Sequence, residues 1–102
     1  HTASLFPWDP ALGEQERLCV AVHPQTAPTP RLTLTLPCFA AAEALLFLVA
    51  GADKAAALAR TLAPADVPTG GPPSPARAVL ARARKATLLC DTAAAAQLRS
   101  PA

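Results

Sequence analysis

Methionine is absent from this 102-residue sequence, and so are runs of basic residues, closely spaced cysteine pairs and long apolar segments. The nine Lys and Arg residues are scattered singly, without the aromatic–basic interleaving that is typical of nucleic-acid binding. The apolar stretch Ala44–Ala52 is far shorter than a membrane span. The first residues also lack the charged start and apolar middle of a signal peptide. We therefore expect no nucleic-acid partner and no membrane partner.

The three cysteines, Cys19, Cys38 and Cys90, are an odd number and lie far apart in the sequence. This pattern favours reduced, buried thiols of a cytoplasmic protein over a disulfide framework or a zinc site. No other group of residues calls for a metal ion or a redox cofactor, so the sequence predicts neither.

Length and the missing initiator both bear on domain organisation. A chain of 102 residues fits one small domain at most, and much of its 52% apolar content is alanine, which buries little area per residue. Without a methionine, the sequence begins abruptly with His1. This start predicts a cut through a longer polypeptide.

Hydrophobic periodicity predicts alternating strands and helices. Arg31–Leu36 alternates strictly between Leu and Thr, which predicts a half-buried strand with the two residue types on opposite faces. The unbroken apolar run Ala44–Ala50 is typical of a strand that is covered on both faces, as in a parallel sheet. Two more strands are expected over Leu18–Val22 and Ala86–Cys90, and helices over Pro37–Glu43, Asp53–Leu62, Pro75–Arg84 and Thr92–Arg99.

Proline and glycine mark the connections between these elements. Pro24–Pro30 predicts an extended connector and Ala63–Pro75 a surface loop, while His1–Pro10 predicts a loop with one helical turn over Thr2–Phe6. Asp91 is placed to cap the last helix. The order of elements predicts a layered α/β fold, a mostly parallel sheet with flanking helices.

Four segments, in the right order, resemble the glucosamine-6-phosphate isomerase/6-phosphogluconolactonase family: His1–Pro7, Arg31–Pro37, Leu46–Ala55 and Leu89–Ala95. The resemblance implies a Rossmann-like fold of the NagB type. It also implies an N-terminal region with a glycine-rich phosphate loop, an acidic residue near the sugar and several further strands. None of these features is in the present sequence. The resemblance therefore implies that residues 1–102 are the C-terminal part of a single α/β domain, whose N-terminal half is an expected partner.

The same resemblance implies hydrolysis of 6-phospho-D-glucono-1,5-lactone to 6-phosphogluconate, a step of the oxidative pentose phosphate pathway that needs no cofactor. It assigns His1 as the base that activates water, a role that suits a side chain with an ordinary pKa of about 6.5. It assigns Lys54 to the substrate phosphate, and the end of a parallel strand followed by a helix N-terminus favours an anion there. Gly51 and Arg31 are further substrate-binding candidates. Because half of the site is missing, we expect the isolated chain to be inactive.

Other interpretations remain open. From the residues alone, an unstructured terminal histidine and a solvated helix lysine are simpler explanations of His1 and Lys54. A glucosamine-6-phosphate deaminase or isomerase is one alternative, although those enzymes have an acidic residue a few positions after the histidine, where this chain has Leu5-Phe6-Pro7. A non-catalytic sugar-phosphate-binding protein is the other. It is favoured by three departures from the family pattern: Trp8 in place of Gly, and Ala40 and Glu43 in place of Asn and a basic residue. Leu88 in place of Trp is a further departure.

Overall fold

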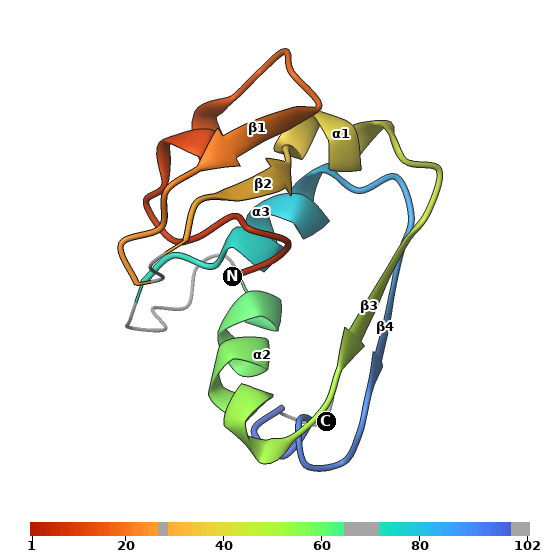
Figure 1. Ribbon diagram of the computed structural model, residues 1–102. Coiled ribbons are helices and arrows are strands. Elements are labelled where there is room, and N and C mark those ends of the chain that lie inside the picture. Colours follow the sequence, from red (N-terminus) through yellow and green to blue (C-terminus); the bar gives the residue numbers. More distant parts are fainter. Residues whose placement is uncertain (27–28, 65–71, 99–102) are drawn as a thin grey trace.

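A computed structural model describes residues 1–26, 29–64 and 72–98 (Figure 1). As far as Cys90, its helices and strands follow one another as the sequence predicts, with one further short helix near the start of the chain. In chain order they are η1 (Pro10–Gly13), β1 (Cys19–Val22), β2 (Arg31–Leu34), α1 (Leu36–Ala41), β3 (Leu45–Val49), η2 (Ala52–Lys54), α2 (Ala55–Leu62), α3 (Pro75–Arg82) and β4 (Ala86–Cys90).

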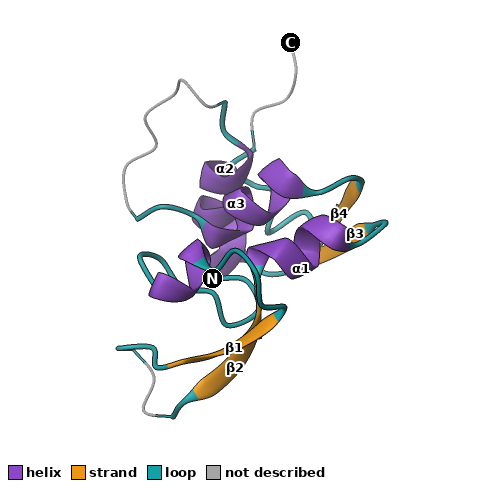
Figure 2. Ribbon diagram, turned by 90° about the horizontal axis from the view of Figure 1, so that it is seen from above, coloured by secondary structure: helices purple, strands orange, loops and turns teal. Residues whose placement is uncertain are grey.

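The four strands form two separate pairs. β3 and β4 are parallel, with Leu45 opposite Ala86 and Val49 opposite Cys90, and α2 and α3 form the connection between them. β1 and β2 are antiparallel and join no other strand among the described residues. Figure 2 shows the two pairs standing apart, with the helices grouped beside them. The predicted α/β class and parallel pairing are confirmed, and the antiparallel pair adds to them.

Two local predictions are wrong. Thr2–Phe6 is not a helical turn, because Thr2 and Leu5 exchange backbone hydrogen bonds of 3.2 and 2.9 Å across a tight two-residue turn. Thr92–Leu98 forms consecutive turns rather than a regular helix, although Asp91 caps its start as expected. Residue Arg99, where that helix was predicted to end, lies outside the described residues. The loop predicted over Ala63–Pro75 also lies largely outside them.

The hydrophobic core joins the start of the chain to β1, α1 and α3. Leu5 and Val79 are fully buried, and Phe39 and Phe47 pack against this cluster from the sides. Pro37 occupies the first turn of α1, and Pro75 occupies the first turn of α3 behind its capping residue Ser74. The core thereby fixes the segment that begins with His1.

The threonine face of β2 points inward. Thr33 is 2% exposed, whereas the neighbouring Leu32 is 73% exposed. The hydroxyl of Thr33 accepts a hydrogen bond from the Ser4 N–H at 3.1 Å and donates to the Leu34 carbonyl at 2.8 Å. Thr35 is fully buried as well, and its hydroxyl donates to the carbonyl of Arg17. The predicted half-buried strand is confirmed, and its buried half is polar because these hydroxyls satisfy backbone groups.

β3 is covered on one face only among the described residues. Phe47 packs on the core, whereas Leu46 is 60% and Leu48 is 74% exposed. The prediction of a strand covered on both faces is therefore not met by this part of the chain, since no described element packs over these leucines.

The cysteines also differ from expectation. All three are free thiols, but Cys19 and Cys90 are exposed and only Cys38 is partly buried. Cys19 lies on the outward side of β1, where alternate residues face away from the core. In the described part of the chain, no helix is long and apolar enough to cross a membrane.

Candidate functional site

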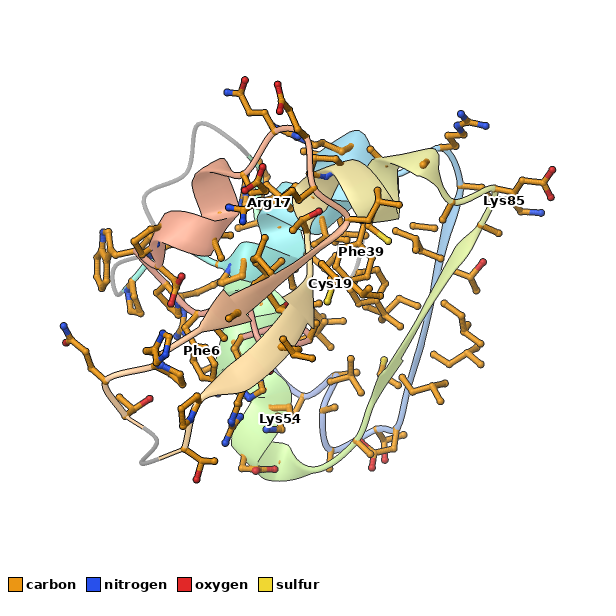
Figure 3. The ribbon with its side chains drawn as sticks, turned by 45° about the horizontal axis from the view of Figure 1, so that its top comes forward. Phe6, Arg17, Cys19, Phe39, Lys54 and Lys85 are labelled. Carbon is orange, nitrogen blue, oxygen red and sulfur yellow. The ribbon has the colours of Figure 1, made fainter. Side chains whose placement is uncertain are left out.

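A cavity of about 560 Å³ lies between the start of the chain, helix α2 and the strands β2 and β3. Its size is within the range of small-molecule sites. His1 lines it from the N-terminal turn, and Lys54 lines it from the start of α2. Figure 3 shows Lys54 at that end of α2, and Phe39 in the space between β2 and β3. The remaining lining is mainly apolar, with the hydroxyls of Thr61 and Ser74 among it.

The position of His1 depends on the tight turn that follows it. Ala3 has a φ of 52°, in the left-handed region that non-glycine residues seldom adopt. Its carbonyl oxygen lies 3.0 Å from Nδ1 of His1. Because a carbonyl only accepts hydrogen bonds, Nδ1 carries the proton and Nε2 of the neutral ring is left with a free lone pair.

The ring of Phe6 gives His1 a second contact. The two ring centroids lie 4.7 Å apart with an interplanar angle of 27°, which is a stacked arrangement. The guanidinium carbon of Arg31, at the start of β2, lies 5.7 Å from the centroid of the same Phe6 ring. Arg31 itself does not line the cavity, so the substrate-binding role predicted for it stays a prediction.

Lys54 reaches the cavity because the chain turns sharply at Gly51. Gly51 has a φ of 99°, and a Cβ atom placed there would lie 2.7 Å from Oδ1 of Asp53. Only glycine adopts this backbone conformation without strain. The side chain of Lys54 is 57% exposed, and its Nζ lies 4.0 Å from Oδ2 of Asp53. Asp53 does not line the cavity, so this exposed pair leaves the ammonium group available to an anion.

Asp91 holds the Gly51 turn from the neighbouring strand. Its carboxylate accepts hydrogen bonds from the Gly51 N–H at 3.1 and 3.2 Å and from the Ala94 N–H at 2.8 Å. The Ala94 N–H and then the Gly51 N–H lower the pKa of Asp91. The sequence predicted that Asp91 caps the following segment. It did not predict the contact with Gly51, because that contact joins the ends of β3 and β4 and no local pattern indicates it.

A second polar cluster lies beyond this site, around η1 and β1. Glu14 pairs with Arg17 at 2.7 Å. The Arg17 side-chain hydrogen bond is the main cause that lowers the pKa of Glu14 to about 2, with the Arg17 and Glu16 N–H groups adding to it. These groups satisfy one another and so read as a structural contact. Across the described residues, no group of three or more His, Cys, Asp and Glu side chains could hold a metal ion.

Trp8 adopts a φ of 60°, again in the left-handed region, and is 74% exposed. Trp8 stands where the resemblance implies a glycine, and glycine is the residue that adopts such a φ without strain.

The sequence of this chain matches a known protein family. The family described as glucosamine-6-phosphate isomerases/6-phosphogluconolactonase matches residues 1–89. A 6-phosphogluconolactonase of Streptomyces coelicolor is 46% identical over 99 residues, which are 96% of this chain and 36% of that protein. A human 6-phosphogluconolactonase is 38% identical over 102 residues, 99% of this chain and 38% of that protein.

A solved structure agrees with these sequence matches. The crystal structure of 6-phosphogluconolactonase from Leishmania guyanensis superposes with a TM-score of 0.77 at 30% identity, covering 98% of this chain and 38% of that one. The chain thus spans little more than a third of the length of the relatives that it matches.

Proposed function

The chain belongs to the glucosamine-6-phosphate isomerase/6-phosphogluconolactonase family, and from this membership we propose that it supplies the base and the phosphate ligand of a 6-phosphogluconolactonase. The observation that carries the proposal is that His1 and Lys54, which are far apart in the sequence, line one cavity. The substrate is 6-phospho-D-glucono-1,5-lactone, and the product is 6-phosphogluconate.

In the proposed reaction, Nε2 of His1 accepts a proton from water as the water oxygen attacks the lactone carbonyl carbon. The hydrogen bond from Nδ1 to the Ala3 carbonyl supports this role, because it leaves Nε2 as the acceptor. The tetrahedral intermediate then collapses, the bond between the carbonyl carbon and the ring oxygen breaks, and the imidazolium returns its proton to that oxygen. A hydroxyl and a carboxylic acid result, and His1 is neutral again. The acid then releases its remaining proton to solvent at neutral pH and becomes the carboxylate.

Lys54 binds the substrate phosphate in this proposal. Its position past the end of a parallel strand and at the start of a helix favours a phosphate anion, and its ammonium group is a mobile point charge. Gly51 acts through its backbone, since its positive φ turns the chain so that Lys54 faces the cavity. The reaction uses no cofactor.

We further propose that residues 1–102 form the C-terminal part of one larger domain, whose N-terminal part covers the open leucine surface. This surface consists of Leu34, Leu46 and Leu48, three exposed side chains that also line the cavity. The relatives support this proposal, because about 60% of their length lies outside the match. The chain together with such an N-terminal part, as one polypeptide or as two, is called the assembled enzyme below. The isolated chain is then inactive.

The test is lactone hydrolysis by the assembled enzyme, with the N-terminal part taken from the Streptomyces coelicolor relative if none accompanies the chain. His1→Gln should abolish turnover while substrate binding persists. Lys54→Met should raise KM. The matched control is Lys85→Met, which changes an exposed lysine outside the cavity lining and should leave both kcat and KM unchanged (Figure 3). Undiminished turnover in His1→Gln would refute the role of His1.

Association of the two parts provides a separate test of the open leucine surface. Leu46→Asp should weaken the binding of the N-terminal part and the recovery of activity on mixing, because a charge would be buried at the contact. Leu18→Asp is the control, since Leu18 is 57% exposed, close to the 60% of Leu46, and does not line the cavity. Equal effects of the two changes would contradict the proposed contact.

The two alternatives are separated by the same assay. A deaminase would release ammonia from glucosamine 6-phosphate, but the side chain stacked on His1 is the neutral ring of Phe6 rather than a carboxylate. A non-catalytic binding protein would retain sugar phosphate and show no turnover with either substrate. We place the enzyme in the cytoplasm, a proposal that the three free thiols support. Fractionation of the source cells would test it.

A further inference from the structure

We propose that Phe6 is a positioning residue, whose ring holds the imidazole plane of His1 so that Nε2 is presented to the cavity. The inference rests on the proposed lactonase function of this site. It starts from the stacked contact between the two rings, with centroids 4.7 Å apart.

His1 needs such a contact because its side chain is exposed and is not held by core packing. A single hydrogen bond from Nδ1 to the Ala3 carbonyl lets the ring pivot about that bond. A flat surface against one face of the imidazole removes this remaining freedom. The hydrogen bond therefore selects the tautomer, and the stack with Phe6 selects the plane.

Phe6 is itself well anchored. In the sequence it lies between Leu5, which is fully buried, and Pro7. Its carbonyl accepts a hydrogen bond from the Asp9 N–H at 3.1 Å. The guanidinium of Arg31 lies over the ring at 5.7 Å, within the range of a cation–π contact. Arg31 thereby restrains Phe6 from the start of β2, a segment far away in the sequence.

The neutral ring also suits the reaction. A carboxylate against the imidazole would stabilise the protonated ring, which cannot act as a base. Phe6 orients the base without adding a negative charge. A phenylalanine at this position thus fits lactone hydrolysis better than it fits an enzyme that needs an acidic residue beside its histidine.

The experiment compares Phe6→Leu and Phe6→Tyr in the assembled enzyme. Because misplacement of a reacting group by about 1 Å costs about 100-fold in rate, we expect Phe6→Leu to lower kcat by about 10- to 100-fold with little change in KM. Phe6→Tyr keeps the stacked ring, so its kcat should stay within about threefold of that of the unchanged enzyme, a smaller loss than the one expected for Phe6→Leu. Glu14→Gln, a change in the polar cluster beyond the site and outside the cavity lining, controls for loss of stability and should leave kcat unchanged.

Arg31→Met provides a second variant, at an exposed position. The proposal predicts a lower kcat with an unchanged KM, whereas a direct contact of Arg31 with substrate predicts a higher KM. An unchanged kcat in Phe6→Leu, or a kcat in Phe6→Tyr as low as in Phe6→Leu, would overturn the role of Phe6.

Proton NMR of the His1 ring separates this inference from the proposed function. The ring current of Phe6 should move the His1 ring protons upfield, and Phe6→Leu should abolish the displacement. If the assembled enzyme hydrolyses no lactone but the displacement is present and is lost in Phe6→Leu, the positioning contact stands and the lactonase function fails. If the enzyme is active and neither kcat nor the ring protons respond to Phe6→Leu, the inference fails alone.

Discussion

Replacing Ala3 by glycine should stabilise the protein, which is the opposite of the usual effect of glycine. Ala3 is exposed and holds a φ of 52° in the two-residue turn between Thr2 and Leu5. The turn keeps its backbone hydrogen bonds after the change, since they join Thr2 to Leu5. The only atom lost is the Cβ that makes the left-handed backbone costly.

The size of the effect follows from two opposing contributions. The left-handed region costs an L-residue roughly 1–2 kcal/mol. Glycine offsets about 0.5–1 kcal/mol of this gain, because an unfolded chain with glycine has more conformational freedom to lose on folding. We therefore expect Ala3→Gly to raise the free energy of unfolding by about 0.5–1 kcal/mol. In the helical interior of α2, where φ is negative, the comparison change Ala59→Gly should lower the free energy of unfolding by about 1 kcal/mol.

Urea unfolding of the assembled enzyme measures both changes. With a slope of about 2 kcal/mol per molar urea, the midpoint should rise by about 0.3–0.5 M for Ala3→Gly and fall by about 0.5 M for Ala59→Gly. A midpoint that falls in both variants would refute the reasoning, because it would mean that the turn carries no strain at Ala3.

Three further changes test other contacts. The pKa of Glu14 is lowered to about 2 from 4.5, so the stabilisation by its carboxylate is complete above pH 4.5 and is lost as the pH falls towards 2. Glu14→Gln should therefore make the urea midpoint less dependent on pH over that range, and an unchanged pH dependence of the midpoint would count against the Arg17 contact. Asp91→Ala removes the acceptor of the Gly51 N–H and should speed hydrogen exchange of that amide and raise KM, whereas protection as in the unchanged protein would show that the contact is dispensable. Thr33→Val leaves the Ser4 N–H without its partner and should lower the free energy of unfolding by about 1–3 kcal/mol, measured by urea unfolding; a neutral result would mean that water replaces the hydroxyl.

Local patterns predicted the elements well because each has its own sequence signal. Leu45–Val49 is an apolar run that ends at a glycine, and Pro75–Arg82 begins with a serine cap and a proline. Alternation in Arg31–Leu36 identified the strand, but it did not tell which face is buried. That choice depends on the backbone of Ser4 and Arg17, which approaches the threonines from elsewhere in the chain.

The candidate site was predictable in its residue types and less so in its geometry. His1 and Lys54 were both predicted, and they line one cavity. The stack of His1 on Phe6 and the tie from Asp91 to Gly51 were not predicted. A ring contact within a turn requires the left-handed φ of Ala3, and alanine gives no sign of that conformation in a sequence. The tie from Asp91 requires the register of β3 and β4, which no local pattern specifies.

The open leucine surface has a consequence for the life of the protein in the cell. Chaperones and quality-control proteases recognise exposed apolar segments, and Leu46 and Leu48 offer such a segment on a strand with few charges. Copies with this surface covered escape recognition, while uncovered copies are retained or degraded. Where the part that covers β3 is a separate polypeptide, the abundance of the chain should then follow the supply of that part rather than the rate of synthesis of the chain.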